Sequence, residues 1–478
     1  MTERTPMDPF EQRLARLART YTQPAARPID SLATARAAMS APAARSALLE
    51  RAWLPTLDRR LVLLLVVAGL VIALAALALA AGSALQPRDP GPGRIVFVRD
   101  GDLFVSEIDG TGVTRIRDGH ANGTELGYLA ALWSPDMRHI AAIHDLGGPI
   151  LTPAVEILAA DGTGERSIEP GPGGTPSMSW SPDSKRLAIA AYPGEVSRDA
   201  TEPILGELRL SIVELDGGSQ EIALPPGATW FASALPETWT IPDLGVRWSP
   251  DGKWIAVGAW NVAVGRWYLA AADGSTVQPL SELVEGQCHV PADWIDWFPD
   301  GWRLATVGDL AGNNELCVEA LGTGGGDAAA TPEPGIVAAI PDDPSSNLHG
   351  KLNLPNVAPD GDRIAISTFM DDFDLGRHVT TLRVYDLASG RATDVASGVE
   401  TLVLTGSGAA QVTGTLEGNP VWMGGIAWSP DGRQLLYLSP EPGAGPKRFT
   451  IRAVDAVGGS PSSVVLEGVR SFDLGYLH

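Results

Sequence analysis

One short motif recurs six times between residues 133 and 432, and this repeat constrains the fold more than any other feature of the sequence. In each copy an apolar residue and a small or aromatic residue precede a Pro-Asp pair. Proline presets φ for a turn, aspartate bonds neighbouring backbone N–H groups, and the glycine that usually follows accepts a positive φ. An apolar stretch follows each copy, so the unit is a strand, a tight turn and a strand. The copies are Trp133-Ser134-Pro135-Asp136, Trp180-Ser181-Pro182-Asp183, Trp248-Ser249-Pro250-Asp251-Gly252, Trp297-Phe298-Pro299-Asp300-Gly301, Val357-Ala358-Pro359-Asp360-Gly361 and Trp428-Ser429-Pro430-Asp431-Gly432.

A second, glycine-containing turn follows most copies and is typical of a β-hairpin. Each repeat therefore contains about four strands. The motif aspartates follow one another at intervals of 47, 68, 49, 60 and 71 residues. Four-stranded units of roughly 40–50 residues plus insertions are propeller blades. The second turns are Asp161-Gly162, Asp216-Gly217, Asp273-Gly274, Ser389-Gly390 and Gly458-Gly459.

These repeats resemble those of the TolB-like β-propellers, which carry a Trp-Ser-Pro-Asp-Gly turn, and the resemblance covers about residues 94–478. It implies an extracytoplasmic propeller that binds proteins or other ligands. It does not imply catalysis, because the family contains both stand-alone propellers and propellers fused to peptidases. Met137 and Ser184 stand where the other copies have glycine, so looser turns are expected there.

The predicted fold is an all-β, seven-bladed propeller over residues 94–478, with six- and eight-bladed rings as alternatives. Residues 94–116 begin at the second strand of a blade, because they lack the Pro-Asp turn and the strand before it. Residues 468–477 form a single strand. We expect these two segments to make the seventh blade together and so remove the exposed sheet edges that would otherwise template aggregation.

An apolar run, Leu61 to Ala81, contains no charged or polar side chain. At about 1.5 Å per residue it spans roughly 31 Å, close to the ~30 Å hydrocarbon core of a bilayer. It predicts a transmembrane helix over residues 61–82, followed by a Pro/Gly linker over residues 83–93. A buried core helix and a signal peptide cleaved near Ala78-Leu79-Ala80 are the alternatives. Basic residues before the run predict a single-pass cell-membrane protein with a cytoplasmic N-terminus and an extracytoplasmic propeller; they are Arg45, Arg51, Arg59 and Arg60.

The cytoplasmic tail, residues 1–60, is predicted to be partly helical. Asp8-Pro9-Phe10-Glu11 has an N-cap, a first-turn proline and an acidic third position. An apolar stripe follows at helical spacing, and a second, Ala-rich helix is expected over residues 31–39. The layout resembles membrane-bound anti-sigma-like regulators, which implies a cytoplasmic protein partner. The tail lacks cysteine, so the zinc-binding motif of many such regulators is absent. A tail that only sets topology is the alternative.

Charge and cysteine content exclude several functions. The net charge is −22, and residues outside the tail carry 25 basic and 51 acidic side chains, so no nucleic-acid partner is expected. Two cysteines are too few for a four-thiolate zinc site or an iron–sulfur cluster. No cofactor is predicted. Outside the cytoplasm, Cys288 and Cys317 could persist as a disulfide, and two buried thiols are the alternative.

No catalytic motif is apparent, and the chain is predicted not to be an enzyme. There is no Gly-x-Ser-x-Gly elbow, and the seven histidines include no His-x-x-x-His pair. A propeller-based hydrolase or lyase and an envelope scaffold of the TolB type are the alternative functions. The motif aspartates are expected to cap their turns rather than bind calcium, since each is alone where calcium needs six to eight oxygens; they are Asp136, Asp183, Asp251, Asp300, Asp360 and Asp431. The acidic run at residues 371–374 is expected to be a solvated loop, and no metal site is predicted.

Three long insertions fall where one blade should join the next, on the face opposite the Pro-Asp turns. They are Leu224–Asp243, Gly322–Lys351 and Thr405–Gly424. Long loops on a rigid scaffold are often functional, and aromatic side chains are enriched in binding hot spots. Trp230, Phe231 and Trp239, in the first insertion, are therefore the predicted binding residues for a protein, peptide or glycan. The alternative is that they fold back as a lid over adjacent blades.

Overall fold

The computed structural model describes most of the residues that the repeats predict to be folded, all within one compact unit, Pro87–His478. The described residues are 93–120, 126–147, 152–164, 166–171, 175–191, 204–226, 228–232, 245–261, 264–285, 294–310, 313–321, 335–341, 348–404, 410–418, 420–421, 425–441 and 448–475. The predicted tail, transmembrane helix and most of the linker lie outside them. No helix among the described residues is long and apolar enough to cross a bilayer.

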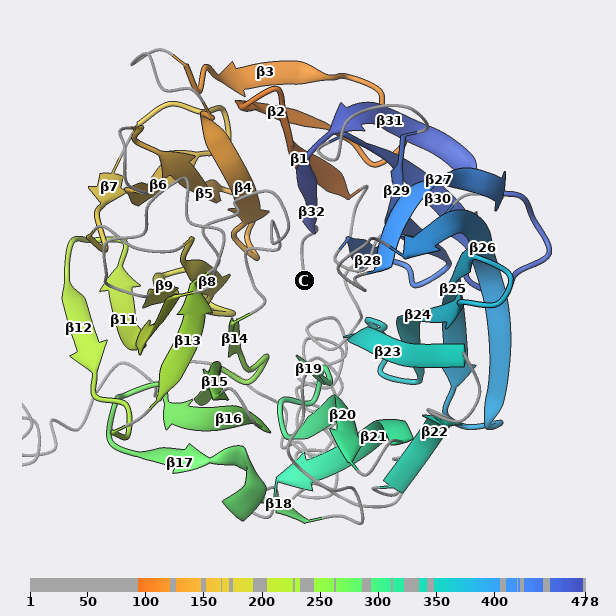
Figure 1. The fold of residues 1–478 in the computed structure, drawn as a ribbon. Helices are drawn as coiled ribbons and strands as arrows, with labels where there is room; N and C mark the ends of the chain where they lie inside the picture. Colours follow the sequence, from red (N-terminus) through yellow and green to blue (C-terminus); the bar gives the residue numbers. More distant parts are fainter. Residues whose placement is uncertain are drawn as a thin grey trace, which may run out of the picture. The chain divides into compact units, whose positions relative to one another are not determined.

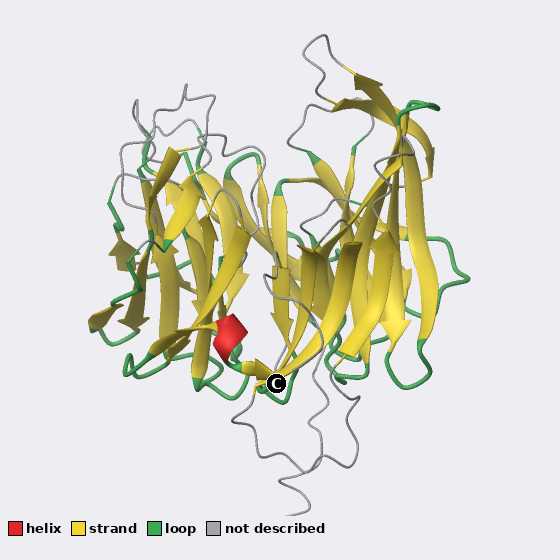
Figure 2. Ribbon diagram, turned by 60° about the horizontal axis from the view of Figure 1, so that its bottom comes forward, coloured by secondary structure: helices red, strands yellow, loops and turns green. Residues whose placement is uncertain are grey.

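Seven antiparallel sheets of four or five strands are arranged in a ring, each sheet forming one blade (Figure 1). The predicted β-propeller with seven blades is confirmed. Figure 2 shows the same ring turned toward its side, with the strands of each blade standing next to one another.

The first four blades are listed from the centre of the ring outward. The first contains β32 (Ser471–Gly475), β1 (Arg94–Arg99), β2 (Asp102–Glu107) and β3 (Thr114–Arg117); the second β4 (Tyr128–Trp133), β5 (His139–Asp145), β6 (Pro153–Ala159) and β7 (Arg166–Ile168); the third β8 (Ser177–Trp180), β9 (Arg186–Ala191), β11 (Arg209–Glu214) and β12 (Ser219–Ile222); the fourth β14 (Val246–Trp248), β15 (Trp254–Asn261), β16 (Val264–Ala271) and β17 (Val277–Pro279).

The remaining blades carry additional strands. The fifth contains β19 (Trp294–Trp297), β20 (Arg303–Leu310) and β21 (Asn313–Leu321), with β18 (Val284–Glu285) and β22 (Gly335–Pro341) both paired to β21; the sixth β23 (Leu348–Val357), β24 (Arg363–Asp372), β25 (Arg377–Asp386), β26 (Arg391–Leu404) and β27 (Ala410–Gly418); the seventh β28 (Ile426–Trp428), β29 (Gln434–Pro440), β30 (Phe449–Asp455) and β31 (Ser463–Val469). Two further strands, β10 (Ile204–Glu207) and β13 (Thr229–Ala232), form a separate ribbon, and a 3-10 turn, η1, covers Leu280–Glu282.

The first blade is closed by strands from opposite ends of the propeller sequence, as predicted. Strand β32 pairs with β1 in antiparallel register, from Arg94↔Gly475 to Val98↔Ser471. The carboxylate of Asp473 accepts a 2.8 Å hydrogen bond from the Trp133 backbone N–H in the second blade. The predicted boundary was too early, because residues 468–469 still belong to β31, and the closing strand begins at Ser471.

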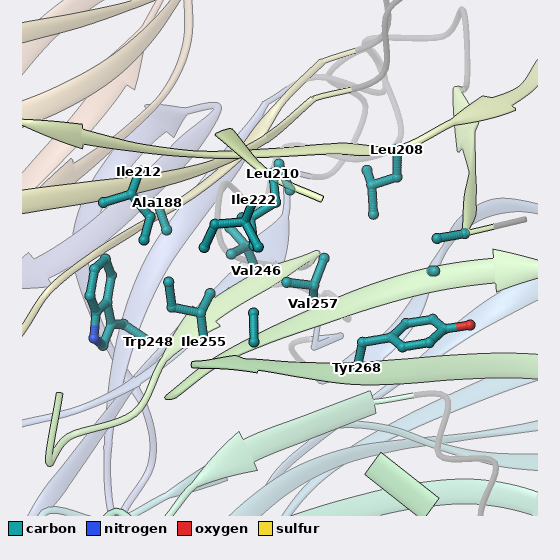
Figure 3. Packing of buried hydrophobic residues seen from close by; sticks show 14 of the residues in the cluster. Ala188, Leu208, Leu210, Ile212, Ile222, Val246, Trp248, Ile255, Val257 and Tyr268 are labelled. Carbon is teal, nitrogen blue, oxygen red and sulfur yellow. The ribbon is translucent and has the colours of Figure 1, made fainter. Parts of the chain in front are cut away.

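The core lies between the blades. Buried apolar side chains of the described residues form seven clusters, each shared by two neighbouring blades. Figure 3 shows the cluster between the third and fourth blades, where Leu210 and Ile212 face Ile255 and Val257. Each blade is therefore covered on both faces, which explains why its inner strands are continuous apolar runs rather than alternating ones.

The repeated tryptophans are buried between blades. Their exposed fractions fall between 3% and 7% in the five copies that have tryptophan. Arginines at the start of a neighbouring blade's second strand stack on three of these rings: Arg94 on Trp133, Arg186 on Trp248 and Arg363 on Trp428, at 4.7 to 5.6 Å. Cation–π contacts of this kind add to the apolar packing that joins adjacent blades.

Candidate binding face

Antiparallel strand order fixes which connections share a face of the ring. The turns between first and second strands, and between third and fourth strands, lie on one face, which we call the turn face. The connections between second and third strands, and between blades, lie on the other, which we call the loop face.

On the turn face each motif aspartate organises its own turn. In the second blade, Asp136 Oδ1 accepts hydrogen bonds from the Ser134 hydroxyl at 2.7 Å and from the Arg138 N–H at 3.0 Å. The other five aspartates accept backbone N–H groups through the same oxygen. Every oxygen used in this way serves the turn, which fits the capping role expected from the sequence.

The expectation of looser turns at Met137 and Ser184 was wrong. Both residues adopt the positive φ of the glycines they replace, 57° and 60°, and both turns keep a 2.8 Å backbone hydrogen bond. Ser184 gains a further contact, because its hydroxyl accepts the Asp136 N–H at 2.9 Å. This bond joins the turns of adjacent blades and offsets part of the strain of a left-handed serine.

On the loop face the first predicted insertion is not a plain loop. Its residues 229–232 form β13, which pairs with β10 from the connection between β9 and β11. The register places Trp230 opposite Gly206 and Phe231 opposite Leu205. The side chains of Trp230 and Phe231, and the whole of Trp239, lie outside the described part, so their binding role remains a prediction.

The other two insertions also contain strands that the sequence reading assigned to loops. Gly322–Lys351 includes β22, the outer strand of the fifth blade, and the start of β23. Thr405–Gly424 includes β27, a fifth strand that pairs with β26 from Gly398 onward. The signal was present in β27, where Val412, Thr413 and Thr415 give the β-branched composition of a strand. Pairing with a neighbouring strand satisfies backbone groups that a long loop would leave to water.

The sixth blade extends furthest on the loop face, because β24 and β25 are ten residues long. Their connecting turn holds the acidic run. Asp372 Oδ1 accepts the Leu375 N–H at 2.9 Å, and Asp371 Oδ1 lies 2.5 Å from His378 Nδ1. Met370 and Leu375 are 43% and 64% exposed. The turn therefore presents apolar side chains beside carboxylates, and no group in the described residues has the three ligands needed to hold a metal ion.

Three titratable groups of the sixth blade lie in one cross-strand row. The register aligns Asp371 with His378 and His378 with Glu400. Burial raises the pKa of Glu400, and the nearby His378 offsets part of this effect. The row lies on the second, third and fourth strands of the blade, away from the central tunnel.

A second polar cluster is sealed between the first and second blades. The Tyr128 hydroxyl donates to Glu156 Oε2 at 2.5 Å, and His144 Nδ1 lies 2.8 Å from Glu156 Oε1. The other ring nitrogen of His144 lies 3.0 Å from the Gly119 carbonyl oxygen. Burial lowers the pKa of His144, but its two hydrogen bonds outweigh this and raise it. All three side chains are buried, so the cluster joins blades and offers no access to a substrate.

A buried carboxyl in the fifth blade was not anticipated from the sequence. Glu319 on β21 is 1% exposed, and its Oε1 accepts the Thr306 hydroxyl at 3.3 Å. Its Oε2 has no hydrogen-bond partner. Burial raises the pKa of Glu319 to about 7. Cys317, two residues earlier on the same strand, is also buried, and the described residues contain no free cysteine. Because Cys288 lies outside them, the Cys288–Cys317 bridge remains a prediction.

Comparison with known proteins gives likeness at the level of fold only. No family model matches the chain, and no curated protein matches it. TolB from Acinetobacter baumannii is 14% identical, with 80% of this chain and 66% of that chain covered and a TM-score of 0.41. A putative 6-phosphogluconolactonase from Bacteroides uniformis is 12% identical, with coverages of 80% and 99% and a TM-score of 0.46. This chain thus spans just under two thirds of the TolB chain. The class that its own sheets define is the all-β, seven-bladed propeller.

Proposed function

We propose that this protein is a non-catalytic, membrane-anchored binding protein whose loop face engages a protein, peptide or glycan partner. The observation that carries the proposal is that strand insertions enlarge this face: the β10–β13 ribbon, the long β24–β25 hairpin and β27. Strands give an inserted segment a fixed shape, and preorganised surfaces lose less entropy on binding. The turn face, by contrast, consists of short turns whose polar side chains bond their own backbone.

Apolar exposure at the β24–β25 turn supports the same face. Met370 and Leu375 lie beside Asp371 and Asp372, a combination of apolar contact area and charge that suits a partner with a basic, partly apolar surface. Together with the predicted Trp230, Phe231 and Trp239, these residues give the loop face two candidate contact regions.

A catalytic role has less support from the described residues. The Asp371–His378–Glu400 row lies away from the tunnel, and the Tyr128–Glu156–His144 cluster is closed to solvent. A substrate must reach the acid and base within hydrogen-bonding distance. An envelope scaffold of the TolB type would use the same binding surface and differs in the number of partners.

The membrane anchor in this proposal comes from residues 61–82, and its orientation can be tested directly. A cysteine introduced in the tail, Ser46→Cys, should be protected from a membrane-impermeant thiol reagent in intact cells. One introduced on the propeller, Ser275→Cys, should react beyond the background of the native cysteines. The reverse pattern would invert the topology.

The binding face is tested by crosslinking the full chain in its native membrane and identifying the attached partners. Trp230→Ala with Trp239→Ala, and separately Met370→Asp with Leu375→Asp, should reduce the yield of one specific crosslinked partner at least tenfold. Val457→Asp is the matched control, because Val457 is 80% exposed on the turn face. Unchanged crosslinking in both loop-face variants, or loss only in the control, would move the site elsewhere. Lost crosslinking with a large fall in melting temperature would support the lid alternative for the tryptophans.

A further inference from the structure

A cavity of about 260 Å³ opens on the rim between the sixth and seventh blades. One wall is residues 394–397 of β26, and the other is residues 460–462, just before β31. Tyr437 of β29 lies between the two walls and lines the inner end. The cavity is separate from the loop-face insertions, because residues 460–462 follow the Gly458-Gly459 turn of the turn face.

Two local features hold the cavity open. Strand β26 has a bulge at Val395, where the register shifts from Arg383↔Asp394 to Leu382↔Ala396. Strand β27 covers the outer edge of β26 only from Gly398 onward, so the wall ends where that pairing begins. At the lower end, the turn of the seventh blade packs closely on β26: a Cβ added to Gly458 would lie 3.0 Å from Thr393 Cγ2.

The inner end carries a polar atom that the protein leaves unbonded. Tyr437 is fully buried, and its hydroxyl has no hydrogen-bond partner. Burial raises the pKa of Tyr437. Ser462 is near enough to lower it in part, but the contact lacks hydrogen-bond geometry. A buried hydroxyl without a partner costs about 1–3 kcal/mol and usually indicates a bound group that supplies the bond.

The lining is rich in hydroxyls and carries no free charge. Serine hydroxyls at 397, 460 and 462 surround the opening. The one charged side chain, Asp394, is bonded through both oxygens to Arg383, at 2.5 and 3.0 Å. Hydroxyls both donate and accept, so they match a ligand whose own groups do the same. An anion would meet the Asp394 carboxylate and no lining cation to balance it.

We propose that this cavity binds a neutral pyranose ring, with one sugar hydroxyl bonded to Tyr437 and others to the serine hydroxyls. The volume lies just below the range of about 300–1,000 Å³ found for drug-sized ligands, which suits a single sugar ring. The site is independent of the proposed loop-face function, since it shares no residue with that face.

Saturation-transfer NMR on the full-length protein tests the proposal, with glucose, galactose and N-acetylglucosamine as probes. At least one sugar should bind saturably with a Kd on the order of 1 mM, as expected for a small ligand. Tyr437→Phe should weaken that affinity about tenfold, the effect of one lost hydrogen bond. Its melting temperature without sugar should not fall, because the variant removes an unbonded hydroxyl. Ser397→Trp should abolish binding by filling the cavity, whereas Ser275→Trp, at an exposed serine after the equivalent turn of the fourth blade, should not.

Inorganic phosphate and acetate are the competing probes. Neither should displace the sugar. The proposal is overturned if no sugar binds saturably, if phosphate or acetate competes for the site, or if Tyr437→Phe binds as tightly as the natural chain. A fall in the melting temperature of Tyr437→Phe would also overturn it, because the hydroxyl would then have a structural partner.

Discussion

Strand β32 closes the ring, and its removal tests how the propeller is stabilised. Deleting residues 471–478 removes five residues paired with β1, from Arg94↔Gly475 to Val98↔Ser471. It also removes the buried Leu474 side chain and the bond from Asp473 to the Trp133 N–H. The freed edge of β1 would expose Ile95 and Phe97, which are fully buried in the intact blade.

The expected loss is large on simple bookkeeping. Burial of Leu474 contributes about 1.5–3 kcal/mol, and each backbone hydrogen bond contributes about 0.5–1.5 kcal/mol. Across the five pairs the total is on the order of 5 kcal/mol, a large part of the ~5–15 kcal/mol by which folded domains are stable. The melting temperature should fall by at least about 10 °C, and the exposed edge should promote aggregation.

Scanning fluorimetry measures this fall, and tryptophan fluorescence follows it because the repeated tryptophans are buried between blades. Deleting only residues 476–478, which follow β32, is the control for shortening the chain. Asp473→Ala gives an intermediate step, with an expected loss of about 1–3 kcal/mol for the unbonded Trp133 N–H. A melting temperature that is the same for the long and short deletions would show that closure by β32 does not stabilise the ring.

Three further predictions address single sites. Because burial raises the pKa of Glu319 from 4.5 to about 7, its protonated form favours folding, so its stabilising contribution is complete below pH 4.5 and is lost as the pH rises to about 7. The loss is about 3 kcal/mol, and urea unfolding of Glu319→Gln between about pH 5 and pH 8 should lack it; equal pH slopes would contradict this. Ser184→Ala keeps the positive φ and loses the bond to the Asp136 N–H, so its melting temperature should fall further than that of Ser184→Gly, with a difference of about 1 kcal/mol. Equal effects would mean that the backbone strain is negligible. Mass spectrometry of non-reduced protein from its native membrane should show a linked Cys288–Cys317 peptide, and two free thiols would refute the bridge.

The motif turns account for how much of the fold could be read without coordinates. A Pro-Asp turn fixes its own geometry within five residues, and the apolar runs beside it define strands, so each blade was recognisable locally. The closing blade followed from counting, since residues 94–116 lacked a first strand and one strand remained after the last repeat. The number of blades was therefore predictable from the sequence.

The loop face could not be read in the same way. Whether residues 229–232 form a strand depends on a partner at residues 204–207, which lies in another connection of the chain. The sequence reading assigned β22 and β27 to loops for the same reason, since pairing between strands is a tertiary choice. The aromatic residues Trp230, Phe231 and Trp239 were found from composition, but the exposed Met370 and Leu375 were not, because exposure depends on how far β24 and β25 extend.

The sequence by itself determined a seven-bladed ring with capped turns, because short-range backbone geometry repeats in every blade. The tertiary structure alone decided which polar groups are buried and which remain unbonded. Glu319, His144 and Tyr437 stand in ordinary strand positions, and their environments come from side chains tens of residues away or from a neighbouring blade. Burial and pairing of this kind depend on how blades pack against one another, so neither the raised pKa of Glu319 nor the cavity beside Tyr437 has a local signature in the sequence.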